Sequence, residues 1–352
     1  MKNEQKILIC FNEPTRYYNN YIGKDISDEK ENSDLSEREF LEQIVNIKKV
    51  LEKKYISVET LPINSNTRAA IKKINNYSPD VIMNFVESVE GNANLECYIA
   101  GLYDILEIPY TGNTLISLGN CLNKERAKQI LQSHGIRTPK HFIADFNSIP
   151  SREELSLKFP AILKLAKEDA SIGISEFSVV DNYEALCQRL EYLFSNYNQD
   201  VIIEEYIEGR ELNVAILGDK ILPISEIRFD GLPDDLPKII TYEAKWSPES
   251  VYYKNTIPRC PAPLDEPVKE RIEKMAKEAF EALECRDYAR VDIRLNAKNI
   301  PYVIEVNPNP DISPDAGFIR SAGTAGISYD EVLYTLIRMA LKRRHYDTQA
   351  AI

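Results

Sequence analysis

Hydrophobic and polar residues alternate along the first third of the chain in a way that predicts strands and helices in turn. Short apolar runs typical of strands occupy residues 6–11, 56–61 and 81–85. Apolar side chains at helical spacing occupy residues 35–55, 67–75 and 95–106. This alternation predicts an α/β fold with an open, mainly parallel sheet. The polar stretch at residues 15–33 interrupts it and is interpreted as a long surface loop.

The pattern changes near residues 112–120, where we place a domain boundary. A helix at residues 124–134, closed by Gly135, follows this boundary. Beyond it, apolar runs predict strands at residues 161–165, 176–180, 201–205 and 212–217. Helical spacing predicts helices at residues 183–194, 268–283 and 329–341.

Two strands near the C-terminus, residues 290–294 and 302–307, carry charged side chains at alternate positions. If they pair as a hairpin across residues 296–300, one face holds Arg290, Asp292, Arg294, Val303, Glu305 and Asn307. Magnesium prefers oxygen ligands, and a guanidinium matches phosphate oxygens with paired hydrogen bonds. The hairpin therefore predicts a hard-cation site beside a phosphate binder. The alternative is the solvated outer face of an ordinary hairpin.

A lysine inside an apolar strand, Lys164, precedes a loop of small residues. A buried ammonium requires an anionic partner, which a phosphate would provide. The small residues Ala170, Ser171 and Gly173 would let backbone amides approach phosphate oxygens closely. The alternative is a surface turn with a lysine that extends to water.

The strand at residues 201–205 runs into a polar turn. Glu204, the backbone of residues 206–207 and Glu211 have a spacing that could border an adenine and then reach a ribose. By itself this pattern is unspecific, and the alternative is a strand that ends in a charged turn.

Composition and charge mainly exclude certain classes of partner, metal site and function. A net charge of −12 over 352 residues argues against a nucleic-acid partner, because phosphate backbones require clustered Lys and Arg. No apolar run approaches the length of a membrane span, so we expect a cytoplasmic protein without a membrane partner. Six separated cysteines and three histidines indicate neither a zinc site nor a disulfide framework. The motifs of serine hydrolases, Walker-type nucleotide binding and dinucleotide binding are absent from the sequence.

In their order, these segments resemble the ATP-grasp superfamily, and most closely its D-alanine–D-alanine ligase-like branch. The resemblance spans nearly the whole chain and is carried by residues 108–112, 123–128, 159–164, 203–211, 242–245, 290–292 and 305–307. It implies a three-part fold with ATP between the second and third parts. The implied parts are an N-terminal α/β domain (1–120), a central ATP-grasp subdomain (121–211) and a C-terminal ATP-grasp subdomain with the metal site (212–352).

The resemblance also implies roles for individual residues and an ADP-forming ligation. In that reaction ATP and a carboxylate give an acyl phosphate, which an amine attacks to form an amide; the partners are thus a small carboxylate and a small amine. The implied nucleotide contacts are Lys124, Lys164, Ser171 and Lys245 at the phosphates, Glu204 and the Ile207 backbone at the adenine, and Glu211 at the ribose. The implied ligands of two Mg²⁺ ions are Asp292, Glu305 and Asn307. Arg290 and Lys245 are the implied catalytic residues, and relatives suggest a homodimer.

The sequence departs from the family at positions that recognise the substrate. Ala170 and Trp246 stand where D-alanine–D-alanine ligases carry a serine and a tyrosine, while Asp311 and Asp315 lie in the loop that meets the second alanine. Added carboxylates would repel a free carboxylate and favour an acceptor with a positive or hydrogen-bond-donating group. Both aspartates could instead point to solvent or cap the turn. Glu37 matches an acidic substrate contact of the family, although helix capping explains it equally well.

Three functions therefore remain open from the sequence. We expect an ATP-dependent carboxylate–amine ligase that acts on an amino acid or a small peptide-like substrate. The alternatives are a D-alanine–D-alanine ligase with unusual pocket residues and a nucleotide-binding regulator without turnover. A binding protein would not require the full set of implied metal ligands and phosphate lysines.

Overall fold

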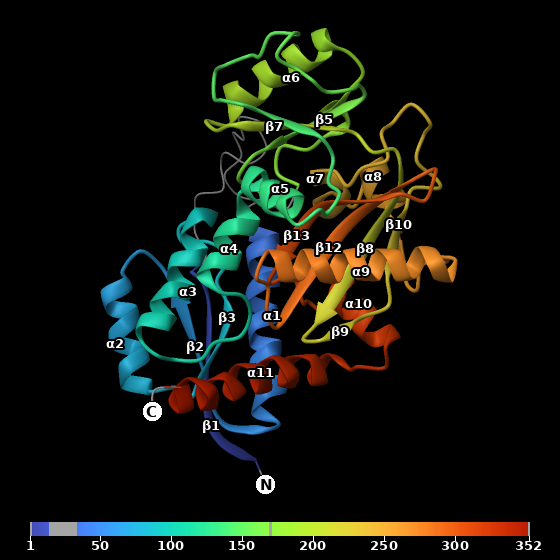
Figure 1. Ribbon diagram of the computed structural model, residues 1–352. Helices are drawn as coiled ribbons and strands as arrows, with labels where there is room; N and C mark the ends of the chain where they lie inside the picture. Colours follow the sequence, from blue (N-terminus) through green and yellow to red (C-terminus); the bar gives the residue numbers. More distant parts are fainter. Residues whose placement is uncertain (1, 14–33, 169–170, 351–352) are drawn as a thin grey trace.

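The computed structural model describes residues 2–13, 34–168 and 171–350, with the backbone alone for residues 34–39 and 344–350. The surface loop expected at residues 15–33 and the small residue Ala170 lie outside these ranges. The chain forms three sheets with helices packed against them (Figure 1).

The N-terminal sheet is parallel, with strand order β2-β1-β3, as the alternating pattern predicts. Its strands are β1 (Asn3–Asn12), β2 (Tyr55–Ile63) and β3 (Val81–Phe85). Its helices are α1 (Asp34–Glu52), α2 (Thr67–Tyr77) and α3 (Glu96–Ile105), and the short 3₁₀ helix η1 (Ala93–Leu95) leads into α3. Ile7 and Ile9 face one core and Leu8 and Cys10 face another, so β1 is buried on both sides.

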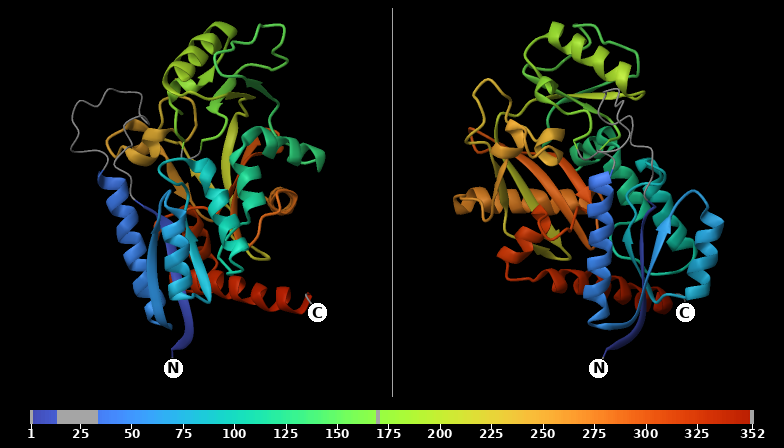
Figure 2. Two further views of the ribbon diagram at one scale, coloured as in Figure 1. Left: turned by 90° about the vertical axis from the view of Figure 1, so that its left-hand side faces the viewer. Right: turned by 180° about the vertical axis from the view of Figure 1, so that it is seen from behind.

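The central sheet is antiparallel, with order β4-β7-β5-β6. It comprises β4 (His141–Ala144), β5 (Ala161–Leu165), β6 (Val179–Val180) and β7 (Val201–Glu205). Helix α6 (Tyr183–Asn196) covers its outer face (Figures 1 and 2) and shares a core with Leu163 and Ile203. The opposite face carries Lys164 and Glu204.

The strand predicted at residues 176–180 is wrong over most of its length. Residues Glu176–Ser178 form a 3₁₀ turn, η2, and only Val179 and Val180 pair with β5. The turn forms because the Ser178 hydroxyl accepts the Ser175 N–H at 3.0 Å and the Ser175 carbonyl accepts the Ser178 N–H at 2.9 Å. Such local bonds compete with strand pairing.

The C-terminal sheet is antiparallel, with order β11-β10-β8-β12-β13 and β9 paired to β8. Its strands are β8 (Gly209–Leu217), β9 (Lys220–Ile221), β10 (Ser225–Arg228), β11 (Ile257–Arg259), β12 (Tyr288–Asn296) and β13 (Pro301–Pro308). Helix α9 (Glu266–Ala282) covers the apolar face, where Ile272, Ala276 and Val291 are buried. The predicted hairpin is thus confirmed, and its charged side chains lie on the face away from α9.

One detail of the hairpin prediction is wrong. Asp292 pairs with Glu305, but Ile293 pairs with Val303, so Ile304 is an extra residue in a β-bulge. The bulge changes the alternation, and Val303 enters the apolar core rather than the face of Glu305.

Short helices join the sheets. Helix α4 (Leu115–Leu122) and helix α5 (Lys124–Ser133) meet at Asn123, whose side chain accepts the Arg126 N–H and begins α5. Near the candidate site lie α7 (Tyr242–Trp246) and α8 (Val251–Asn255), followed further along by α10 (Gly317–Thr324). The expected boundary after residue 120 falls within α4, and that after residue 211 falls within β8.

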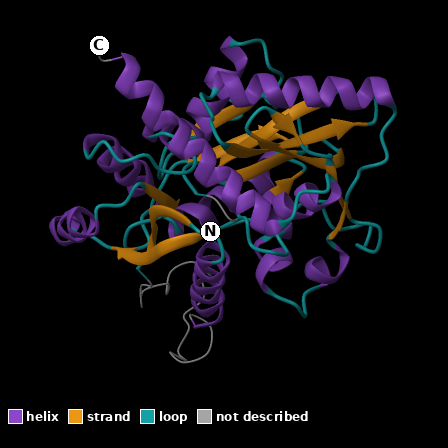
Figure 3. Cartoon of the chain, turned by 90° about the horizontal axis from the view of Figure 1, so that it is seen from below, coloured by secondary structure: helices purple, strands orange, loops and turns teal. Residues whose placement is uncertain are grey.

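The last helix, α11 (Tyr329–Ala350), crosses the underside of the molecule toward the N-terminal sheet (Figure 3). Its buried Leu333 and Ile337 belong to the same core as Ile7 and Ile9 of β1. The two ends of the chain therefore share one hydrophobic core, although hundreds of residues separate them.

Candidate functional site

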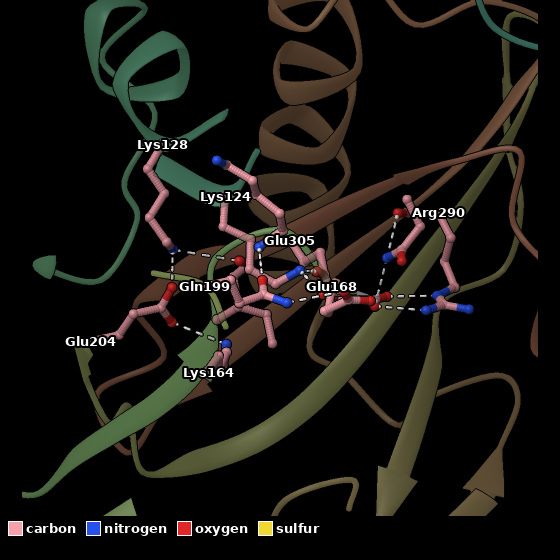
Figure 4. A network of polar contacts seen from close by, with 12 residues as sticks. Lys124, Lys128, Lys164, Glu168, Gln199, Glu204, Arg290 and Glu305 are labelled. Atoms are coloured by element: carbon pink, nitrogen blue, oxygen red, sulfur yellow. Dashed lines mark hydrogen bonds and ion pairs between the residues drawn. The ribbon is translucent and has the colours of Figure 1, made fainter. Parts of the chain in front are cut away.

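A buried glutamate, Glu204 on β7, lies between two ammonium groups (Figure 4). Its Oε1 is 2.9 Å from Lys128 Nζ and its Oε2 is 3.0 Å from Lys164 Nζ. Burial alone would raise the pKa of this carboxyl, but the two lysines outweigh that effect and lower it to about 2. Glu204 is therefore an ionised hydrogen-bond acceptor at neutral pH.

Lys128 was not among the residues predicted for the site. It lies one helical turn after Lys124 on α5, and its side chain is 2% exposed. The available signal was the four-residue spacing, which places both lysines on one helix face beside the buried Ala127 and Leu131. Burial lowers the pKa of Lys128, and the carboxylate of Glu204 partly offsets this.

A second ion pair joins α5 to the metal-site hairpin. Lys124 Nζ is 2.8 Å from Glu305 Oε1 and donates to the Glu168 carbonyl at 2.6 Å. Burial would raise the pKa of Glu305, but Lys124, Lys164 and Lys245 lower it to about 2. Lys245, on α7, is exposed but also lowers this pKa, so all three predicted phosphate lysines act on the charge of Glu305.

The predicted catalytic arginine, Arg290, forms a bidentate ion pair with a predicted metal ligand, Asp292. Arg290 donates to both oxygens of Asp292 at 2.8 Å, and the Asn307 amide donates to the same carboxylate at 2.9 Å. A residue that the sequence analysis missed, Asn213 of β8, donates to Asp292 at 2.7 Å. Burial would lower the pKa of Arg290, but Asp292 and Glu305 raise it, so the guanidinium stays charged.

The predicted ribose ligand, Glu211, is buried and pairs with Arg294 across adjacent strands at 2.6 Å. Burial raises the pKa of Glu211, and Arg294 opposes this. Ile207 lies in the turn between β7 and β8 and is partly exposed. The predicted adenine and ribose contacts are thus at the two sides of one strand connection.

The predicted phosphate loop contains two residues with left-handed backbone, Ser171 (φ 61°) and Gly173 (φ 73°). A buried arginine of α6, Arg189, fixes the loop through the Gly173 carbonyl at 2.6 Å and the Ser178 hydroxyl at 2.9 Å. The loop also reaches α7, because the Ile174 carbonyl accepts the Tyr242 N–H at 3.1 Å. Arg189 is the third site residue, after Lys128 and Asn213, that was not predicted from the sequence.

The proposed substrate residues are more dispersed. Trp246 on α7 is 47% exposed, with its ring centroid 6.4 Å from that of Tyr242. Asp311 is exposed and accepts the Ser313 N–H at 2.8 Å, and Asp315 is also exposed. This contact makes Asp311 a turn cap, the alternative that the sequence left open. Glu37 lies on α1, and its side chain is outside the described residues.

The oxygen donors Asp292, Glu305 and Asn307 fit magnesium in kind, because a hard cation takes carboxylate and amide oxygens. Asp292 and Glu305 are directly paired on adjacent strands. Within the described ranges, no group of three or more His, Cys, Asp or Glu side chains could hold a metal without further ligands. Asn307 and phosphate oxygens would have to complete the coordination.

Comparison with known proteins identifies relatives along most of the chain. The family described as "D-ala D-ala ligase C-terminus" matches residues 131–338, more than half of the sequence. D-alanine–D-alanine ligase A of Bacillus cereus is 32% identical over 253 residues, covering 70% of this chain and 77% of the relative. An uncharacterized protein of Sinorhizobium fredii, y4sG, is 29% identical over 266 residues, which is 75% of each.

Solved structures give the same result. The D-alanine–D-alanine ligase of Bacillus anthracis complexed with ATP superposes with a TM-score of 0.72 at 27% identity, covering 97% of this chain and 99% of that one. A further structure of that ligase gives a TM-score of 0.74. Among the described helices of the present chain, none has the length and apolar character required to cross a membrane.

Proposed function

Since this chain belongs to the D-alanine–D-alanine ligase family of ATP-grasp enzymes, we propose that it joins a small carboxylate to an amine through an acyl phosphate. The protein is an ATP-dependent, ADP-forming carbon–nitrogen ligase. The proposal adds the intermediate and the substrate class, an amino acid or a small peptide-like molecule. Lys124, Lys164, Ser171 and Lys245 would contact the phosphates, and Glu204, Ile207 and Glu211 the nucleoside.

The observation that carries the proposal is the convergence of cations on one hairpin. Lys124 pairs with Glu305 and Arg290 pairs with Asp292, and these two carboxylates are neighbours on adjacent strands. Phosphoryl transfer requires positioning and neutralisation of charge rather than a protein nucleophile. The lysines, the arginine and the oxygen ligands at this site can position the phosphates and neutralise their charge.

In this proposal a carboxylate oxygen of the first substrate attacks the γ-phosphorus of ATP, and ADP leaves. The amine then attacks the acyl carbon, and the bond from that carbon to the bridging oxygen breaks, so the phosphate carries away an oxygen of the original carboxylate. Arg290 would stabilise the charge on the transferring phosphoryl group and on the tetrahedral oxyanion. Magnesium, held by Asp292, Glu305 and Asn307, would neutralise phosphate charge.

The proposed function differs from D-alanine–D-alanine ligation only in its substrates. The names of several relatives favour D-alanine–D-alanine ligation. Trp246 and Asp311 replace the groups that the family resemblance assigns to recognition of D-alanine. We therefore expect little D-alanyl-D-alanine and better turnover with an acceptor that carries an extra cationic or donor group. Because Asp311 caps its own turn, its charge is only partly available to a substrate.

The test is a matrix of amino acids and dipeptides as donor and acceptor pairs, with ADP release and product mass as readouts. Efficient dipeptide formation from D-alanine alone would contradict the proposed substrate preference. Asp311→Gly, which removes only the charge and the cap, should shift acceptor preference toward neutral amines. Lys342→Met, which alters an exposed residue of α11, provides the surface-charge control.

A further inference from the structure

The ammonium group of Lys128 is buried and bridges three segments of the chain. It forms an ion pair with Glu204 of β7 at 2.9 Å and donates to the Thr138 hydroxyl at 2.9 Å. Its third contact is the carbonyl of Ile304 at 3.5 Å. One ion pair and two hydrogen bonds therefore hold the ammonium at the junction of these segments.

The Ile304 contact arises from the β-bulge in β13. Ile304 is the extra residue between the pairs Asp292–Glu305 and Ile293–Val303, and its carbonyl accepts from Lys128. The next residue, Glu305, is a proposed magnesium ligand. Lys128 therefore connects the proposed adenine-side carboxylate to the strand that carries the proposed metal ligand.

The carboxylate of Glu204 keeps acceptor capacity in spite of its two cations. Glu204 is 1% exposed, and within the described residues its Oε1 accepts no well-aligned hydrogen bond, although Lys128 Nζ lies 2.9 Å away. A buried acceptor without an aligned donor is costly, and an amino group of a ligand would satisfy it. The facing groups are Lys128 and Lys164, with His141 opposite on β4.

We propose that Lys128 is a positioning residue for nucleobase selection, which holds Glu204 as an ionised acceptor for the 6-amino group of a purine. This inference rests on the proposed nucleotide role of Glu204. An ionised carboxylate accepts from a 6-amino group but repels a 6-oxo group, whereas a protonated carboxyl could donate to the 6-oxo oxygen. Removal of the lysine leaves a buried carboxylate with one cation fewer, which favours its protonation.

The experiment measures by calorimetry the affinity of the protein for non-hydrolysable analogues of ATP and of inosine triphosphate. Lys128→Met keeps the length of the side chain and removes its charge, and Arg126→Met removes an exposed cation from the same helix as a control. We expect Lys128→Met to weaken ATP-analogue binding by about tenfold or more and to reduce the preference over the inosine analogue by a similar factor. Arg126→Met should change neither quantity.

Thr138→Val is the milder variant for the case in which Lys128→Met does not fold, because it removes one partner and keeps the ammonium. It should reduce the same preference by a smaller factor. Equal weakening for both analogues, or no change in either variant, would overturn the inference by leaving Lys128 a purely structural role. A wild-type protein that binds ATP but ligates no substrate would contradict the proposed function instead, and would leave this comparison valid.

Discussion

The carboxylates at the site, Glu204 and Asp292 buried and Glu305 half-buried, are each held by a specific cation, and this pairing determines how the individual residues respond to substitution. Glu305 pairs with Lys124, Asp292 with Arg290, and Glu204 with two lysines. Loss of one member leaves an uncompensated buried charge, so its effect includes more than the lost contact.

Lys164 and Arg290 should affect different steps of the reaction. Lys164→Ala removes a partner of ground-state phosphate, so we expect the KM for ATP to rise by about tenfold or more. Arg290→Ala removes a group that meets developing charge, so kcat should fall by about 10²–10³. Steady-state kinetics in ATP measures both, and an Arg290→Ala variant altered only in KM would contradict its assigned role.

Protonation of Glu204 should destabilise the fold in acid. The pKa of Glu204 is lowered from 4.5 to about 2 in the folded protein, so its contribution is complete above pH 4.5 and is lost as the pH falls toward 2. We expect Glu204→Gln to lower the free energy of unfolding by about 3 kcal/mol at pH 7, because Lys128 and Lys164 lose their partner. This difference should shrink between pH 4.5 and 2.

Urea unfolding at a series of pH values measures this effect. Glu153→Gln, on the exposed surface, is the matched control and should leave the pH dependence unchanged. His141 and the two lysines face Glu204 from the neighbouring elements, and burial lowers the pKa of His141, so the imidazole adds little charge near neutrality. A difference between Glu204→Gln and wild type that stays constant down to pH 2 would contradict the ion-pair assignment.

Among the structural elements, the loop from Ser171 to Ser178 is fixed by hydrogen bonds from α6. Arg189 is 7% exposed, and it holds the loop at Gly173 and Ser178. Because the loop also bonds to α7, which carries Lys245, the arginine orients two groups of predicted phosphate ligands together. Burial lowers the pKa of Arg189.

Arg189→Met should therefore raise the KM for ATP by roughly tenfold while kcat changes less, since the loop loses two hydrogen bonds to a charged donor. Gln188→Met, at the exposed neighbouring position of α6, is the control for a new apolar side chain. Limited proteolysis with and without ATP provides a second readout, and the variant loop should be cleaved faster. An unchanged KM together with a lowered melting temperature would assign Arg189 to stability alone.

The elements that could be predicted from the sequence are those with a strong period. The N-terminal alternation predicted a parallel sheet, and the C-terminal hairpin was predicted with its charged face. Periodicity failed where one residue altered the register: the bulge at Ile304 moved Val303 into the core. It also failed at η2, where the Ser178 side chain bonds the backbone locally, and at α4, an eight-residue helix at the expected domain boundary.

The site was predicted only as far as residue type and family resemblance allow. Lys164, Glu204 and Glu305 were identified and lie in one network of polar contacts, but their roles remain predictions. Lys128, Arg189 and Asn213 were not identified, although α5 and β8 also carry the predicted residues Lys124 and Glu211. Their contribution depends on tertiary contacts that a linear pattern does not contain.

In the whole molecule, the N-terminal and C-terminal sheets are held together by polar contacts as well as by the shared core. The Asp287 carboxylate, which precedes β12, accepts the Gly112 N–H at 2.8 Å and pairs with Arg343 of α11. Arg343 also donates to the Tyr110 carbonyl at 2.5 Å. The end of the chain thereby joins the N-terminal domain to the metal-site strand, so the proposed ligands have a rigid base.

The oxygen balance of the proposed reaction can be followed directly in the whole enzyme. Once a productive donor and acceptor pair is known, the donor carboxylate can be labelled with ¹⁸O and the released phosphate analysed by mass spectrometry. The acyl-phosphate route predicts ADP as the nucleotide product and one ¹⁸O atom in each phosphate, because the carboxylate oxygen stays on phosphorus when the amine displaces it. Unlabelled phosphate, or AMP with pyrophosphate, would contradict that route.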